Sequence, residues 1–229
     1  MHVPDGFLNL PTSAATAVVA AAGVGLAVRG ARRELNERTA PLAGLVAAFI
    51  FAAQMLNFPV AAGTSGHLLG GALAAILVGP WTATLCITVV LITQAFLFAD
   101  GGITALGTNI TLMALVGVWV GWGVFRLVMT VLPKKLASVP LAGALGGFVS
   151  VPAAALTFAA LFAIGGTVPI PAGTVAVAMG SVHLLIGIGE AFITAATLAA
   201  VLAVRPDLVY GARGIAKPIE LTIKEGVPA

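Results

Sequence analysis

Residues 173–204, GTVAVAMGSVHLLIGIGEAFITAATLAAVLAV, decide the fold, because this run contains one acidic residue and no Lys or Arg. About 20 apolar residues are enough for a helix to cross the hydrocarbon core of a bilayer. The run lacks the strict alternation of polar and apolar residues that is typical of membrane β-barrel strands. It therefore predicts a transmembrane helix.

The composition of the whole chain indicates the same class. Of its 229 residues, 60% are hydrophobic and 8% are charged, whereas soluble domains have about 25% charged residues. We therefore expect an all-α integral membrane protein, a single domain over 1–229 with a bundle of about seven transmembrane helices. The other six spans are expected over residues 12–28, 40–56, 66–78, 81–98, 110–132 and 136–164. The short third span, which ends at Gly79-Pro80, predicts a tilted, partly buried or half-length helix.

The basic residues predict the orientation. With seven spans, all 11 Lys and Arg residues fall at one end of the bundle. Cytoplasmic loops are enriched in Lys and Arg, so we expect the amino terminus outside the cell and residues 205–229 to form a cytoplasmic tail. The start of the chain does not resemble a cleavable signal peptide, because Asp5 precedes the first apolar run and the basic residues follow it.

Three histidines, His2, His67 and His183, lie in the outer half of this topology. No Lys or Arg is expected there to repel a cation. The Met1 amine, the His2 amide nitrogen and the His2 imidazole can chelate one ion, in the planar nitrogen set that Ni²⁺ and Cu²⁺ favour. His67 can occupy the fourth corner. The alternative is that His2 caps a surface segment and that the other histidines are structural hydrogen-bond donors.

Polar residues near these histidines have either a supporting or a capping role. A Pro-Asp-Gly turn around Asp5 favours a return of the amino terminus towards the bundle, and Asp5 either accepts a hydrogen bond from the His2 ring or from loop amides, or caps the turn. Asn57 ends the second span. Ser65 or the threonine before it is expected to cap a helix whose first turn contains His67.

Further polar residues follow along the chain. Asp100 lies in a glycine-rich outer turn, Asn109 is expected to cap the next helix, and Gln94 needs a polar partner inside its span. They form a lid, support a metal site or, as we favour, serve the helix ends. His183 and Glu190 are seven residues apart and share a helix face. Glu190 either stabilises packing with Gln94 or His183, or helps a cation to enter or leave.

Enzymatic motifs are not found in the sequence, which contains no GxSxG elbow, no HExxH and no Walker motif. We therefore expect no catalytic residue, and any ATP hydrolysis must belong to other subunits. Two alternatives remain open: a metal-dependent intramembrane enzyme that uses His67, His183 and Glu190, and an ion-coupled transporter or channel that works without ATP.

Four segments together resemble the CbiM/NikM family, the substrate-binding membrane components of energy-coupling factor (ECF) importers for cobalt or nickel. The segments are MHVPDGFL (1–8), NFPVAAGTSGHLLGGALAAILVGPW (57–81), FADGGITALGTNI (98–110) and HLLIGIGEAFIT (183–194). The resemblance extends in order from Met1 through the seventh span. It is carried by the combination of segments more than by any one of them.

The resemblance implies that the amino-terminal segment, residues 1–11, inserts into the bundle from outside. The ion would be held by the Met1 amine, the His2 amide and imidazole, and the His67 imidazole. The expected partners are a transmembrane coupling protein, two cytoplasmic ATPases and a small accessory membrane subunit, in the membrane of a prokaryotic cell. We expect Ni²⁺ or Co²⁺ as the transported ion, with a preference for Ni²⁺, and neither a resident cofactor nor a nucleic-acid partner.

Overall fold

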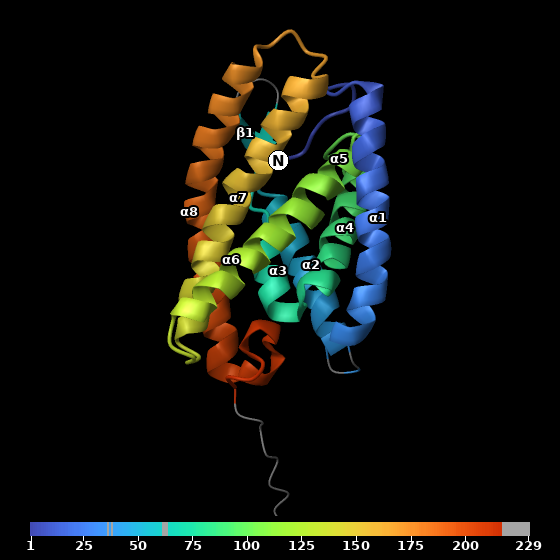
Figure 1. Ribbon diagram of the computed structural model, residues 1–229. Helices are drawn as coiled ribbons and strands as arrows, with labels where there is room; N and C mark the ends of the chain where they lie inside the picture. The colour runs from blue at the N-terminus through green and yellow to red at the C-terminus, as the bar shows by residue number, and fades with distance from the viewer. Residues whose placement is uncertain (36, 38, 61–63, 217–229) are drawn as a thin grey trace, which may run out of the picture.

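The computed structural model describes residues 1–35, 37, 39–60 and 64–216 and is a bundle of helices (Figure 1). Its longer helices form seven successive runs in this part of the chain, as the sequence predicts. They are α1 (Leu10–Glu34), α2 (Thr39–Gln54), α3 (Gly71–Val78), α4 (Pro80–Leu97), the continuous run of α5 (Leu106–Asn109), η2 (Ile110–Gly117) and α6 (Val118–Val131), α7 (Ser138–Gly165), and α8 (Ala172–Val204).

Five of these runs are long and apolar enough to cross a membrane: α1, α4, α5–η2–α6, α7 and α8. Helix α2 is apolar but shorter. A small antiparallel hairpin of β1 (Phe58–Val60) and β2 (Thr64–Gly66) connects α2 to the segment before α3. Two short 3₁₀ turns, η3 (Pro206–Leu208) and η4 (Tyr210–Ala212), follow α8.

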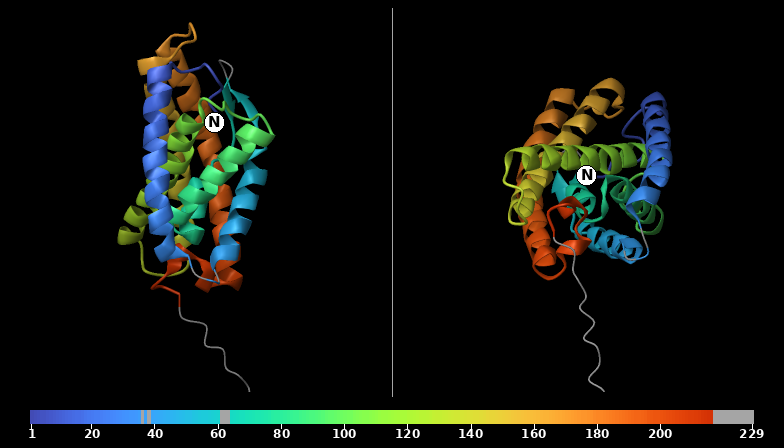
Figure 2. Two further views of the ribbon diagram at one scale, coloured as in Figure 1. Left: turned by 90° about the vertical axis from the view of Figure 1, so that its right-hand side faces the viewer. Right: turned by 60° about the horizontal axis from the view of Figure 1, so that its bottom comes forward.

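Helix α3 is a half-length helix at the centre of the bundle, and all eight of its residues are buried (Figure 2). Small residues allow its neighbours to approach closely. A Cβ atom added at Gly121 of α6 would lie 2.6 Å from the Cβ of Ala72. The sequence therefore builds the core from Ala and Gly contacts, which are typical of helix packing in membranes.

The break between α3 and α4 lies where the sequence predicts it. Gly79 has φ of +97°, a conformation that favours glycine. Pro80 is then the first residue of α4, where its missing N–H is of no consequence.

Two expectations about helix starts are wrong. Helix α3 begins at Gly71 after Gly70 in the left-handed conformation, so His67 precedes the helix and does not lie in its first turn. Asn109 does not cap its helix, because the helix already begins at Leu106. Long-range contacts occur in both places: the N–H groups of Leu69 and Gly70 before α3 bind Glu190 of α8, and the Asn109 side chain binds the backbone of Val3.

The bundle has two chemically different ends. The chain start, the β-hairpin and the α4–α5 loop lie at one end, which we call the amino end, and η3 and η4 lie at the other (Figure 1). All Lys and Arg residues that the structure describes belong to the second end, which we call the basic end. There η4 packs under α3, because a Cβ at Gly211 would lie 2.9 Å from the Ile76 side chain.

Candidate metal site

The first nine residues form a non-helical segment with a turn at residues 5–7, which enters the bundle before α1 begins. Met1 and Val3 are each 1% exposed and His2 is 5% exposed. The Phe7 ring lies against Phe158 and Phe162 of α7, with ring centroids 5.9 and 5.3 Å away. The chain start is therefore part of the core.

Asn109 holds the backbone directly after His2. Its Oδ1 accepts from the Val3 N–H at 2.8 Å, and its Nδ2 donates to the Val3 carbonyl at 3.2 Å. The Gly102 N–H donates to the same carbonyl at 2.9 Å. The amide side chain thus pairs with Val3 as a neighbouring strand would.

Asp5 ties the segment to the α4–α5 loop. Its Oδ1 accepts from the Thr104 N–H at 2.7 Å and from the Thr104 hydroxyl at 2.5 Å. The hydroxyl hydrogen bond is the main cause that lowers the pKa of Asp5 below its usual value. Of the roles that the sequence left open for Asp5, the structure shows the contact with a loop amide and no contact with the His2 ring.

The rings of His2 and His67 stack at the inner end of this segment. Their centroids are 4.4 Å apart with an interplanar angle of 29°. His67 is fully buried, and its Nδ1 donates to the Leu68 carbonyl at 2.7 Å. Its Nε2 has no hydrogen-bond partner among the described residues, so it keeps a free lone pair.

His2 has its two ring nitrogens in different surroundings. Nε2 donates to Gln94 Oε1 at 3.1 Å. Nδ1 lies 3.0 Å from Asp100 Oδ1 but makes no directional hydrogen bond in the described part of the chain. Nδ1 is the nitrogen that closes a six-membered chelate ring with the His2 amide, and it lies beside a carboxylate that attracts a cation.

Burial favours the neutral forms of two candidate ligands. It lowers the pKa of the Met1 amine well below its usual value, and the charge of Asp100 opposes this only in part. Burial also lowers the pKa of His67, and the positive charges of the Met1 amine and His2 add to this effect. A neutral amine and a neutral imidazole are the forms that bind a metal ion.

Among the described residues, no group of three or more His, Cys, Asp or Glu side chains is arranged to hold a metal ion. The candidate donors that lie close together are nitrogens: the His2 and His67 rings stack, and the Met1 amine is near enough for its charge to act on His67. The structure thus brings together the three residues that the sequence singles out. It also brings in Asp100, whose Oδ2 accepts from Asn57 Nδ2 at 2.9 Å.

The remaining candidates from the sequence are His183, Glu190 and Ser65. His183 is buried beside the site, and its charge contributes to the lowered pKa of His67. Its Nδ1 donates to the Met179 carbonyl at 2.8 Å. The hydrogen bonds of Glu190 in the described part of the chain come from two backbone N–H groups after His67, and not from Gln94 or His183. The side chain of Ser65 lies outside the described part of the chain.

Sequence reasoning missed two residues of the site. The sequence suggests only a helix cap for Asn109, although a polar amide in an apolar run is a signal for a more specific role. Thr104 gave no signal, because a threonine in a loop is ordinary. Both act on the backbone of the amino-terminal segment, and no sequence spacing reveals such a contact.

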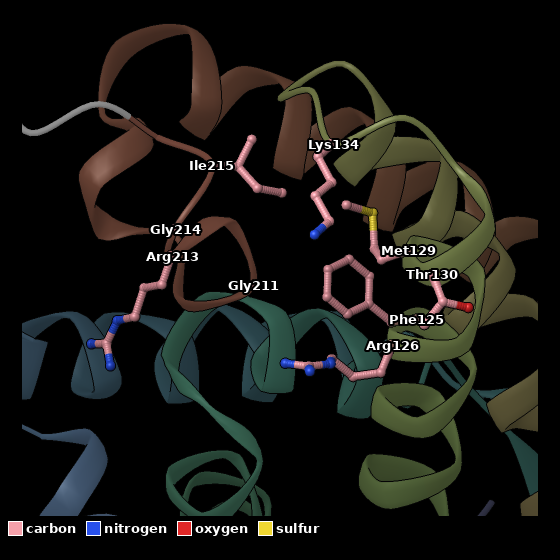
Figure 3. A pocket seen from close by; sticks show the side chains of 9 residues that line it. All are labelled: Phe125, Arg126, Met129, Thr130, Lys134, Gly211, Arg213, Gly214 and Ile215. Atoms are coloured by element: carbon pink, nitrogen blue, oxygen red, sulfur yellow. The ribbon is translucent and has the colours of Figure 1, made fainter.

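A cavity of about 510 Å³ lies at the basic end, away from these histidines (Figure 3). Lys134 and Arg126 line it together with Phe125 and Met129. None of the candidate metal ligands contributes to its walls.

Residues 2–208 match the model of a protein family described as a cobalt uptake substrate-specific transmembrane region. The chain is 36% identical to the fused nickel transport protein NikMN of Rhodobacter capsulatus, over 95% of this chain and 66% of that one. It is 35% identical to the cobalt transport protein CbiM of Sorangium cellulosum, over 91% of this chain and 94% of that one. A crystal structure of a truncated transition metal transporter superposes with a TM-score of 0.83 at 32% identity, over 89% of this chain and 99% of that one.

Proposed function

Because this chain belongs to the CbiM family, the substrate-specific membrane components of cobalt and nickel uptake, we propose that it captures Ni²⁺ outside the cell for an ATP-driven importer of the ECF type. The observation that carries the proposal is the buried set of nitrogens from Met1, His2 and His67. The ion is cargo, so the site must bind it and later release it.

The chemistry of the donors supports the preference for Ni²⁺ over Co²⁺. All four proposed donors are nitrogens, two from the amino-terminal backbone and two from imidazole rings. A deprotonated amide is among the strongest nitrogen donors. Square-planar nitrogen coordination suits Ni²⁺. In this mechanism the His2 Nδ1 exchanges its contact with Asp100 for the ion, while Gln94 holds the other ring nitrogen.

The charge distribution supports an amino end outside the cell. All described Lys and Arg residues lie at the opposite end, and basic loops favour the cytoplasm. A coupling protein and two ATPases would act on the cytoplasmic side, with a small accessory membrane subunit beside them. Their movement would separate His67 from the amino-terminal segment, which breaks the nitrogen set and releases the ion inwards.

The test is a Ni²⁺ titration of the purified protein with two glycines added before Met1. The addition converts the Met1 amine into an amide and makes the histidine the fourth residue, so the new amine and the imidazole no longer complete a square-planar chelate. We expect affinity to fall at least as far as in His67→Ala. A protein with the same two glycines appended after Ala229 is the matched control. An unchanged Ni²⁺ affinity in the amino-terminal variant would rule out the amino-terminal chelate.

The ATP-driven part of the proposal has its own test. Proteoliposomes that contain the chain alone are expected to bind Ni²⁺ without accumulating it. Accumulation should require the coupling protein and ATPases together with ATP. Sustained Ni²⁺ flux through the lone chain would replace this part with an ATP-independent transporter.

A further inference from the structure

Helix α3 has a buried amino terminus that its own segment does not cap. Gly70, the residue before the helix, has φ of +73°, and no side chain of this segment caps it. Buried N–H groups at and just before a helix start need partners. Here the N–H of Gly70 and that of Leu69 before it donate to the carboxylate of Glu190, which comes from the middle of α8.

The Glu190 carboxylate binds two consecutive N–H groups. Oε2 accepts from Leu69 at 2.9 Å and Oε1 accepts from Gly70 at 2.6 Å. Glu190 is 2% exposed. The ion pairs in the described part of the chain are His2–Asp100 and Arg205–Asp207, so no basic side chain neutralises this carboxylate.

A buried acid in a membrane helix is expensive to maintain and commonly marks function. The bound loop indicates which function, because His67 lies two residues before Leu69. The Leu68 carbonyl that accepts from His67 Nδ1 and the Leu69 N–H that donates to Glu190 belong to one peptide group. A trans peptide group is planar and points its C=O and N–H in opposite directions.

We propose that Glu190 is a positioning residue for the metal ligand His67 and acts through this single peptide group. The Glu190 carboxylate accepts from the N–H of this peptide group, and the C=O of the same group accepts from the His67 imidazole. The contact keeps the proton on Nδ1 and presents the free lone pair of Nε2 to the metal. Hydrogen-bonded chains polarise one another, so the carboxylate also makes Nε2 a stronger donor.

The inference rests on the proposed function, because it assigns a role only if His67 binds the ion. It deepens that function by making helix α8 part of the site. The known pattern of a metal-bound histidine with a carboxylate behind it is here extended by one intervening peptide group.

The test is Glu190→Gln, which keeps the size of the side chain but removes its charge and one of its two acceptors. We expect Ni²⁺ affinity to fall about 10–100-fold, as for the loss of other groups that orient a metal ligand. The Ni²⁺ ligand-field absorption band should shift at the same time, because the imidazole donor weakens.

Glu34→Gln is the matched control. Glu34 is also buried and accepts from the backbone N–H groups of Trp81 and Thr82 at the start of α4, at 3.2 and 2.7 Å. It lies at the basic end, far from His67. The control should lose comparable thermal stability while its Ni²⁺ affinity and absorption band stay unchanged.

A double-mutant cycle separates positioning from general damage. If Glu190 acts through His67, the double variant of His67→Ala and Glu190→Gln should bind Ni²⁺ no more weakly than His67→Ala alone. Additive losses, equal losses in both glutamine variants, or an unchanged Glu190→Gln would overturn the inference. If Glu190→Gln does not fold, Glu190→Asp, which keeps the charge but is one methylene shorter, is judged by the same criteria.

The same cycle distinguishes failure of the inference from failure of the proposed function. A His67→Ala variant with full affinity would remove His67 from the site, and the proposed function would fail with it. A weakened His67→Ala beside an unaffected Glu190→Gln would overturn the positioning role alone.

Discussion

At the scale of single residues, the binding of the amino terminus depends on a side chain that is not itself a ligand. Asn109 forms two hydrogen bonds with Val3 and so fixes the backbone adjoining the His2 ring. Asn109→Ala should lower Ni²⁺ affinity about 10–100-fold, as expected when a group that orients a metal ligand is lost. Calorimetric titration in detergent measures the change.

Thr108→Val is the control for this variant. Thr108 is the preceding residue, is equally buried, and shares a hydrogen bond with the Thr16 hydroxyl at 2.7 Å. That hydrogen bond goes to α1 and not to the amino-terminal segment. If both variants bind Ni²⁺ equally well, Asn109 has no specific role in the site.

Burial of the proposed ligands predicts a shifted pH dependence of Ni²⁺ binding. Protons compete with the ion for the Met1 amine and for His67, and the pKa of each is lowered by burial. A base with a lowered pKa keeps its lone pair free to a lower pH, so the protein should lose Ni²⁺ at a lower pH than the free peptide MHVPDGFL. Parallel titrations over a pH series measure both, and coincident curves would contradict the prediction.

At the scale of elements, the sequence predicts the helices well and their ends less well. Apolar length and the Gly79-Pro80 break locate the seven helical runs. The sequence misplaces the start of α3 because local capping rules consider only neighbouring residues, whereas the N–H of Gly70, directly before the helix, binds Glu190, 120 positions away. The π-helical turn η2 between α5 and α6 was not predicted either, since no residue type in it differs from those of an ordinary helix.

The α3–α4 break gives a stability prediction. In Gly79→Ala the added Cβ would lie 2.5 Å from the Glu34 carboxyl carbon, at a φ of +97°. Such backbone conformations cost about 1–3 kcal/mol for residues other than glycine, so the thermal midpoint should fall. Gly123→Ala is the control, because nothing lies within 4 Å of its added Cβ. Equal midpoints for the two variants would argue against this strain.

At the scale of the whole molecule, the candidate metal ligands and the described basic residues lie at opposite ends of the bundle. The amino end combines buried nitrogens with Asp100, which suits a cation, and the basic end carries the described Lys and Arg residues. Helix α3 lies between them, with Glu190 at its start and η4 under its far end. Sequence reasoning predicted the division from charge alone, but the central position of α3 follows only from packing.

This division predicts opposite accessibility at the two ends. Ile103 at the amino end is 53% exposed, and Lys135 at the basic end is exposed as well. The native Cys86 is buried, and its thiol donates to the Ala43 carbonyl. Ile103→Cys should therefore react with a membrane-impermeant maleimide on intact cells, while Lys135→Cys should react only after the cells are permeabilised.

The unsubstituted chain, whose only thiol is Cys86, supplies the background and should stay unlabelled in both conditions. The reverse pattern would place the amino end in the cytoplasm. The ion would then reach His2 and His67 from inside, and a chain oriented that way would serve export. The labelling pattern therefore decides the direction of transport independently of any measurement of metal affinity.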